Sequence, residues 1–123
     1  MALTIGGETS AEELHGHDDP LTLQTLQESF HKRLVAGLPR AQAEEILRGW
    51  GCEPRYVPRE DFSLNSLTTI IVPPPSDGIG ALIAVTGHLE DHWLYDPFAA
   101  IVVHIGKDNN VLAAGYKILG DGP

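Results

Sequence analysis

The clearest hydrophobic pattern in the chain is an alternation of apolar and polar positions near the C-terminus. Ile101, Val103 and Ile105 occupy every second position, and the alternation resumes over residues 112–118 after a turn-forming segment at residues 106–110. A period of two places alternate side chains on the same face of a strand, so this pattern predicts a β-hairpin. A hairpin alone is marginally stable in water, and we therefore expect further strands or helices to cover its apolar face.

Two helical patterns precede the hairpin. The first helix is expected to begin with Asp19 as N-cap and Pro20 at the first helical position, and to end at Gly37. Its apolar stripe consists of Leu23, Leu26, Phe30 and Leu34. A second helix is predicted over residues 39–48, followed by glycines that end it. Its stripe consists of Ala43, Ile46, Leu47 and Trp50. The short turn between the two makes them a helix-turn-helix pair.

Between the helices and the hairpin, the sequence predicts one connection and two further strands. Residues 52–65 contain two prolines and several turn formers, which is typical of a long connection. Residues 67–72 are rich in β-branched side chains and predict a strand that a run of three prolines ends. Residues 79–86 are almost continuously apolar, which indicates a strand covered on both faces. The predicted fold class is therefore α+β, with the helical pair packed on one face of a four-stranded antiparallel sheet in the order ααββββ.

The predicted packing brings side chains from the helices and the sheet into one core. Its expected members are Leu26, Phe30, Leu34, Ile46, Leu47, Ile70, Leu82, Ile101, Val103 and Tyr116. A chain of 123 residues is long enough for one such core, so we expect a single domain over residues 20–123. Residues 1–19 are polar and acidic and are expected to form a mobile tail.

The net charge of −9 is unevenly distributed along the chain. Residues 1–19 hold five Asp and Glu and no Lys or Arg, and residues 60–123 hold eight acids against two lysines. Because the predicted strands lie in the acidic C-terminal half, we expect an acidic sheet surface that repels nucleic acid and anionic membranes and attracts a basic protein. The second helix carries Glu44 and Glu45, and this mixed charge argues against DNA binding by the helix-turn-helix pair. A role of the charge in solubility alone is the alternative.

Cysteine content and hydropathy indicate the compartment. The sole cysteine, Cys52, has no partner for an intrachain disulfide, and no apolar run approaches the roughly 18 residues that span a bilayer. The first residues lack the basic and apolar regions of a secretory signal. These features together predict a cytoplasmic protein that does not bind membranes.

Two segments resemble a known structural group. Residues 35–54 are similar to the signature of the small lipoproteins of the BamE/SmpA type and of the β-lactamase-inhibitor-protein fold, which has a Gly-apolar-Ser/Thr entry, an acidic or Gln-bearing helix and a Gly-x-Pro exit. Residues 101–111 resemble the later strand of that group, an apolar alternation closed by an Asp/Asn/Gly turn and a valine. Pro39 stands where Ser or Thr would cap the helix, the exit is one residue longer than usual, and no lipidation cysteine lies near the N-terminus. The resemblance implies an α+β fold without outer-membrane anchoring, and activity through protein contacts of the sheet rather than catalysis.

One segment contains residues suited to metal binding. If the strand at residues 79–86 continues, His88, Glu90 and His92 share one face and supply a two-histidine, one-carboxylate set for zinc or non-haem iron. This arrangement is the basis of an alternative function as a small metal-dependent enzyme. Gly87 instead favours a loop in which these side chains diverge. No nucleophile elbow or phosphate-binding glycine motif is present, so we predict no catalytic residue and no cofactor.

The same segment has the composition of a protein interface. Its predicted partner-binding residues are Glu90, Asp91, Trp93, Tyr95, Asp96 and Phe98. Aromatic anchors surrounded by charged side chains are typical of protein interfaces, although Trp93 or Tyr95 is also a candidate for the protein's own core. The sequence therefore favours a non-catalytic protein-binding module, of the immunity or inhibitor type, that masks a basic partner. A homodimer formed through the sheet is a further alternative.

Overall fold

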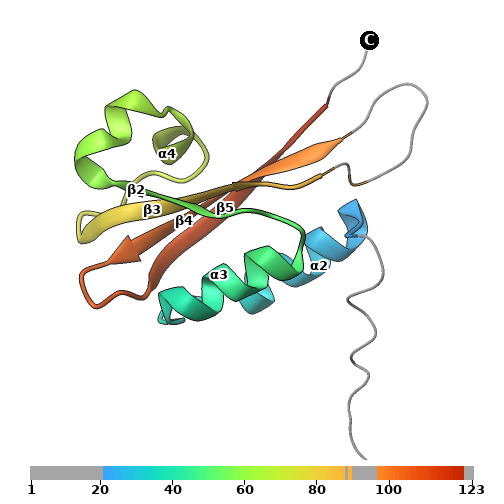
Figure 1. Ribbon diagram of the computed structural model, residues 1–123, viewed down its shortest axis with the longest axis horizontal. Coiled ribbons are helices and arrows are strands. Elements are labelled where there is room, and N and C mark those ends of the chain that lie inside the picture. The colour runs from blue at the N-terminus through green and yellow to red at the C-terminus, as the bar shows by residue number, and fades with distance from the viewer. Residues whose placement is uncertain (1–20, 88, 90–96, 121–123) are drawn as a thin grey trace, which may run out of the picture.

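The computed structural model describes residues 21–87, 89 and 97–120 (Figure 1). The helical elements are α2 (Leu23–Arg33), α3 (Arg40–Gly49), the 3₁₀ helix η2 (Arg59–Leu64) and the single turn α4 (Leu67–Ile70). The strands are β2 (Arg55–Pro58), β3 (Gly78–Val85), β4 (Phe98–Gly106) and β5 (Val111–Leu119). The acidic tail predicted at residues 1–19 lies outside the described residues. Among the residues described, no helix is long and apolar enough to cross a membrane.

The four strands form one antiparallel sheet in the order β2-β3-β4-β5. Helices α2 and α3 lie together under one face of this sheet, which confirms the predicted α+β class and its ααββββ order (Figure 1). The hairpin predicted from the alternating pattern is β4 and β5, joined by a turn in which Asn109 has a positive φ of 64°. The strand predicted at residues 79–86 is β3.

The first strand of the sheet was assigned to the wrong segment. The sheet begins with β2, inside the stretch predicted as a connection, while most of the predicted strand at residues 67–72 is the helical turn α4. Two bonds of Asn65 close that turn: its side-chain Oδ1 accepts from the Leu67 N–H at 3.1 Å, and its carbonyl oxygen accepts from Thr68 Oγ1 at 2.7 Å. These local bonds outweigh the β preference of the branched side chains. Ile70, predicted as core, is consequently 62% exposed.

The two helices begin and end at local signals close to the predicted ones. Helix α2 begins later than predicted, because the Thr22 side chain, rather than Asp19, caps it by accepting a bond from the Thr25 N–H at 3.1 Å. Helix α3 begins after Pro39 as predicted. Gly37 and Gly51 follow the two helices with φ of 92° and 84°, a backbone conformation that only glycine adopts without strain.

The main core lies between the helices and the sheet. Phe30 is fully buried, and its ring lies 4.6 Å from that of Tyr116 in β5 and 5.9 Å from that of Trp50 at the end of α3. Of the predicted core residues, Leu26, Phe30, Leu34, Leu47, Leu82, Ile101 and Val103 are buried in this cluster, and Ile46 and Tyr116 pack against it while partly buried. The helix-on-sheet packing expected from the sequence is therefore confirmed, with Ile70 as the exception.

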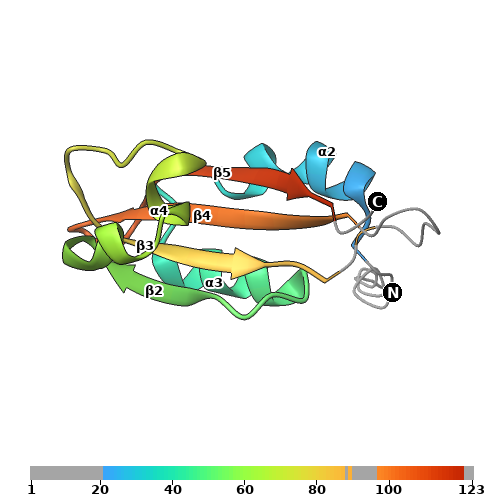
Figure 2. The ribbon, with the colours of Figure 1, turned by 90° about the horizontal axis from the view of Figure 1, so that it is seen from above.

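A second, smaller core lies on the opposite face of the sheet, which we call the far face. Residues 59–77, which include η2 and α4, cover one end of this face (Figures 1 and 2). The cluster between them and the sheet consists of Val57, Phe62, Ala81, Ile83 and Val102. The Arg59 guanidinium holds the end of this cover by donating to the carbonyl oxygens of Pro75 at 2.6 Å and Gly78 at 2.9 Å. Strands β3 and β4 are thus covered on both faces over part of their length, which explains most of their nearly continuous apolar sequence.

Candidate functional site

Most residues of the predicted interface and metal set lie outside the described residues. This applies to His88, Glu90, Asp91, His92, Trp93, Tyr95 and Asp96. Phe98 is described, and it is the half-buried first residue of β4, paired with Leu119. In the described parts of the chain, no group of three or more His, Cys, Asp or Glu side chains is placed to hold a metal ion.

The two chain segments that flank residues 90–96 are fixed on the sheet. The Leu89 N–H donates to the Pro97 carbonyl at 2.7 Å, and its side chain is buried in the main core. One step nearer the sheet, the Thr86 N–H donates to the Ala99 carbonyl at 3.0 Å, and the Ala99 N–H donates back to Thr86 Oγ1 at 2.9 Å. These bonds form a stem at the end of the sheet where β3 ends and β4 begins, so residues 90–96 start and finish at a defined position.

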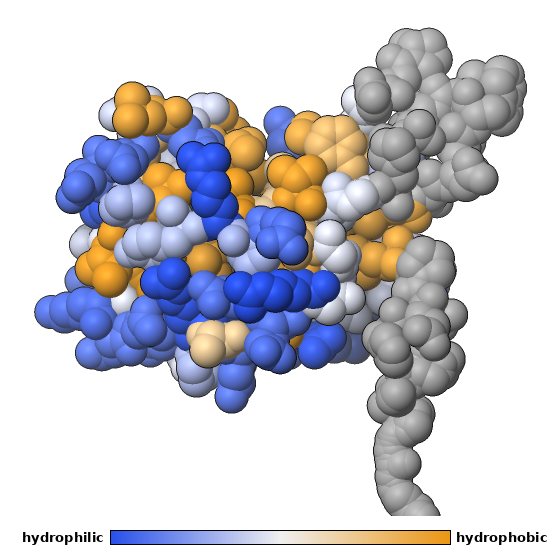
Figure 3. Space-filling view, in the orientation of Figure 1, coloured by the Kyte–Doolittle hydropathy of each residue, from blue (hydrophilic) through white to orange (hydrophobic). Residues whose placement is uncertain are grey.

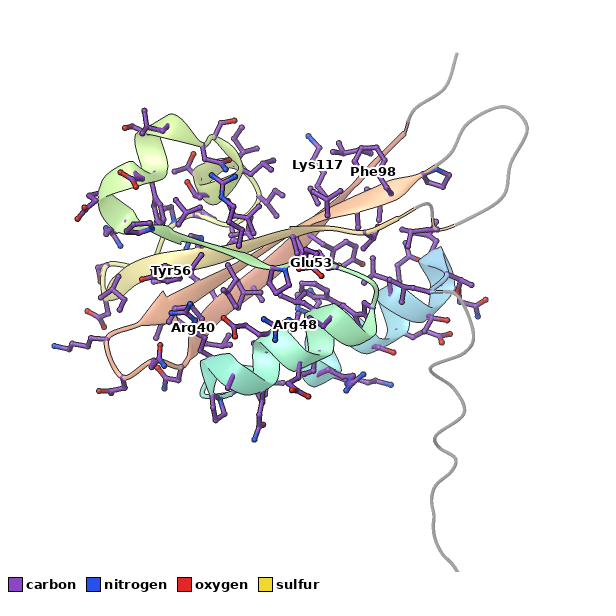
Figure 4. The ribbon with its side chains drawn as sticks, viewed as in Figure 1. Arg40, Arg48, Glu53, Tyr56, Phe98 and Lys117 are labelled. Atoms are coloured by element: carbon purple, nitrogen blue, oxygen red, sulfur yellow. The ribbon has the colours of Figure 1, made fainter. Side chains whose placement is uncertain are left out.

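Within the described part of the chain, the cover formed by residues 59–77 stops short of this end of the far face. Val85, Ala100 and Lys117 stand side by side on three adjacent strands, and Phe98 and Leu119 form the next row outward. We call these five residues the open end. Val85 is 47% exposed and Lys117 is exposed, Phe98 and Leu119 are half-buried, and the small Ala100 between them is buried. Figure 4 shows Phe98 and Lys117 on the α4 side of the sheet, and Figure 3 shows apolar surface on that side.

A shallow hollow borders the open end on the β2 side. It has a volume of about 310 Å³, and its lining residues are Glu53, Arg55, Asn65, Ile83, Ala84 and Val85. The floor is formed by apolar strand residues, while Glu53 and Arg55 are exposed at the rim. An apolar floor with a polar rim suits the side chain of a protein partner better than a reaction centre, which needs convergent polar groups.

The charge of the described part differs from the sequence-based expectation. Residues 21–87, 89 and 97–120 contain all eight Lys and Arg of the chain and eight of its Asp and Glu, so their formal charge is zero. No Asp or Glu lies in any of the four strands, and the expectation of an acidic sheet surface is wrong. The whole excess of nine acidic residues is carried by residues 1–20, 90–96 and 121–123.

Two described side chains of chemically reactive types, those of His104 and Cys52, are buried and have structural roles. His104 is fully buried beneath residues 59–77, where its Nε2 lies 2.9 Å from the Val72 carbonyl oxygen and its Nδ1 has no partner. Burial lowers the pKa of His104, the hydrogen bond to Val72 opposes this, and the Arg59 charge adds to the lowering. Burial raises the pKa of the Cys52 thiol to about 11. Neither group is placed to react with a substrate.

An arginine-rich surface runs along the β2 side of the molecule. The Arg40 guanidinium lies 4.2 Å from the centroid of the Tyr56 ring and 3.0 Å from the Glu44 carboxylate. Arg48 is 3.9 Å from the same carboxylate (Figure 4). The Tyr56 ring occupies the space above Gly80, where an added Cβ would overlap with its hydroxyl group. These contacts attach α3 to the edge of the sheet and leave little net charge for a ligand.

Phe98 is the one member of the open end that the sequence analysis proposed for partner binding. Val85 and Lys117 lay within predicted strands, and neither they nor Ala100 and Leu119 were proposed for partner binding. The alternation predicted which residues share a face within each strand, but the exposed end depends on how far residues 59–77 extend over the sheet. A comparison of the chain with protein-family models, with curated proteins and with solved structures finds no match.

Proposed function

We propose that the protein is a non-catalytic protein-binding module, of the immunity or inhibitor type, that masks a basic protein partner. The binding surface combines the acidic and aromatic segment at residues 90–96 with the open end of the far face. The observation that carries this proposal is the position of the open end. Exposed apolar residues of the sheet lie at the same end as the stem from which residues 90–96 extend.

The open end has the composition of the centre of an interface. Val85, Phe98 and Leu119 provide apolar area, and charged residues border it: Lys117 and Arg55, which are basic, and Glu53, which is acidic. Because two of these three are basic, the attraction for a basic partner has to come from the carboxylates of residues 90–96. Partner surfaces of this kind have an apolar centre and a polar rim, and aromatic side chains contribute much of their binding energy. The trio Trp93, Tyr95 and Phe98 would supply such anchors.

The distribution of charge supports a basic partner. Because the described part has no formal net charge, the net charge of −9 comes from the other segments, and three of those carboxylates belong to residues 90–96. Carboxylates at the rim of an interface attract a basic partner and increase the association rate more than they slow dissociation. The acidity that favours this partner therefore belongs to residues 90–96, whose flanking residues Leu89 and Pro97 lie at this end of the sheet, and not to the strands.

The contribution of charge to partner binding is tested by reversing charges at the two ends of the sheet in separate variants. After a partner has been isolated from the native host by affinity purification at low and moderate salt, association is measured for Glu90→Lys with Asp91→Lys. This double variant is expected to bind roughly tenfold more slowly and with a weaker salt dependence. The matched control is Asp77→Lys with Asp108→Lys, which makes the same charge change in exposed turns at the opposite end of β3 and β4. Equal slowing in both double variants would show a non-specific charge effect.

The contribution of apolar contacts to partner binding is tested by substituting each of two exposed valines. Val85→Arg places a charge in the open end, while Val35→Arg does so after α2, where the valine is similarly exposed at 43%. Only the first variant is expected to weaken the complex, by about 2 kcal/mol or more, mainly through faster dissociation. Trp93→Ala should act in the same direction without lowering the melting temperature. A complex unaffected by Val85→Arg would exclude the open end from the interface.

A further inference from the structure

The two edges of the sheet differ in length and in protection. Strand β2 has four residues, with Pro54 before it and Pro58 as its last residue. Strand β5 has nine residues and no proline. Short edge strands and prolines are common means of preventing a further strand from pairing. Edge β2 is therefore protected, whereas β5 is long enough to accept another strand.

The hydrogen bonds of β4 show which backbone groups of β5 point outward. Both backbone groups of Ala99 bond toward β3, so those of the next residue, Ala100, point toward β5 and its partner Lys117. Backbone groups alternate in direction along an antiparallel strand, so Tyr116 directs its N–H and C=O away from the sheet. The register is regular from the bulge near His104 to the end of β5, so the backbone groups of Ala114 and Ile118 also point away from the sheet.

The beginning of this edge already bonds a backbone partner. The Val111 N–H donates to the Leu38 carbonyl at 2.8 Å, and the Val111 carbonyl accepts from the Gly37 N–H at 2.8 Å. Past this point, no backbone or side-chain group within residues 21–87, 89 and 97–120 bonds the outward groups of residues 114–118. The outward N–H and C=O groups of Ala114, Tyr116 and Ile118 therefore continue the strand edge with which residues 37–38 pair at Val111.

The side chains around this stretch form an open site rather than a buried one. All residues of β5 except Val111 and Gly115 are half-buried or exposed, whereas β4 is buried throughout apart from Phe98. Below the edge, Tyr116 packs on Phe30, and the His31 ring lies 6.3 Å from the Tyr116 ring. Figure 2 shows α2 reaching past β5 on its outer side. A strand added to β5 would thus lie beside the flank of α2 and could bury more of the half-buried side chains of Tyr116 and Ile118.

The position of α2 decides between two possible occupants. Two copies of the chain joined through their β5 edges would bring their α2 helices against each other beneath the shared sheet. A single extended segment requires no such approach, because it would occupy only the shelf formed by α2. Lys117 is the one charged residue of β5, its side chain is exposed, and it projects on the far face. A carboxylate at the facing position of the added strand would complement it.

We propose that residues 114–118 of β5 bind an extended segment of a partner protein as a fifth strand, with apolar side chains toward α2 and an Asp or Glu opposite Lys117. This mode of binding gives affinity through main-chain hydrogen bonds and selectivity through alternate side chains. It uses the edge of the sheet and does not require that residues 90–96 bind a basic partner, so either proposal can fail without the other.

Amide hydrogen exchange of the full-length protein tests whether the edge is free. The N–H groups of Ala114, Tyr116 and Ile118 should exchange much faster than those of Gly115 and Lys117, which point into the sheet. Equal protection of both sets would mean that a second copy or another part of the chain covers the edge, and would overturn the proposal. Sedimentation of the same sample identifies a second copy, since only that occupant doubles the mass.

Selection from a displayed library of random linear peptides supplies the probe for binding. The expected consensus alternates apolar residues with an acidic residue at one position. Ala114→Pro removes an outward N–H and should weaken a selected peptide about tenfold, while the control Ala114→Ser should bind as the wild type does. Lys117→Glu should reverse the preference at the facing position from acid to base by roughly fivefold. Selected peptides that bind Ala114→Pro normally, or that keep their acidic preference with Lys117→Glu, would refute strand addition at β5.

Discussion

Truncation of Phe30 to alanine tests the packing on which the whole fold depends. The side chain is fully buried, and its ring contacts those of Trp50 and Tyr116 at centroid distances of 5.9 and 4.6 Å. Loss of a buried phenylalanine costs about 3–5 kcal/mol, and aromatic pairs add about 0.5–1.5 kcal/mol to area burial. Two such pairs place the expected cost near the upper end of that range. A domain of this size has a free energy of unfolding of about 5–15 kcal/mol, so the variant should lose roughly a third or more of its stability, and its melting temperature should fall sharply.

The assay is thermal and urea unfolding followed by circular dichroism, with two control variants. Phe30→Leu keeps most of the apolar volume and should cost less than half as much. Phe98→Ala removes the same side chain from a half-buried site at the open end and should also cost much less. A Phe30→Ala variant whose melting temperature lies within a few degrees of the wild type would refute the packing of α2 on β5. Equal losses for Phe30→Ala and Phe98→Ala would show that the two sites do not differ in burial.

Four further predictions address other parts of the molecule. Burial lowers the pKa of His104 below 6.5 in the folded state, so the unfolded chain binds more protons than the folded one below that pH. The free energy of unfolding should therefore fall as the pH drops below 6.5. Between about pH 7.5 and 5.5, the melting temperature should fall less for His104→Gln than for the wild type. Gly115→Ala would place a Cβ 2.3 Å from Val72 Cγ2 and should loosen residues 59–77, seen as faster amide exchange in α4, whereas the control Gly49→Ala meets nothing within 4 Å and should be neutral or stabilising. Cys52, with a pKa of about 11 and 2% exposure, should react with a thiol reagent only after unfolding. If His88, Glu90 and His92 hold zinc or iron, elemental analysis should find near-stoichiometric metal that His92→Ala removes, and a metal-free protein would end the enzyme alternative.

Periodicity predicted the parts of the fold in which local and tertiary preferences agree. The stripe through Leu26 and Phe30 and the alternation through Ile101 and Val103 both gave the correct buried face, because burial on one side is what produces these patterns. The helix ends were found within a few residues, since glycine and proline act through local geometry. These features require no knowledge of distant contacts.

Residues 55–72 were mispredicted because tertiary contacts determine their structure. A four-residue edge strand such as β2 gains its stability from pairing with β3, and the prolines just before it and at its last position concealed it. Thr68 and its neighbours have β-branched side chains, but the bonds to Asn65 and the contact with the far face favour a helical turn. The open end could not be predicted either, because it depends on where this segment stops covering the sheet. Charge counting along the sequence likewise assigned to the strands an acidity that belongs to other segments.

The closed stem at the end of β3 and β4 has an evolutionary consequence. The bonds of Leu89 to Pro97 and of Thr86 to Ala99 bring the two strands together before residues 90–96 begin. Substitutions, insertions or deletions within those seven positions therefore leave the register of the sheet unaffected. Related chains are free to diversify this segment while they keep the helices and the sheet, in the way that antibody loops vary on a constant framework. A single scaffold of this kind can accommodate many different sequences at residues 90–96.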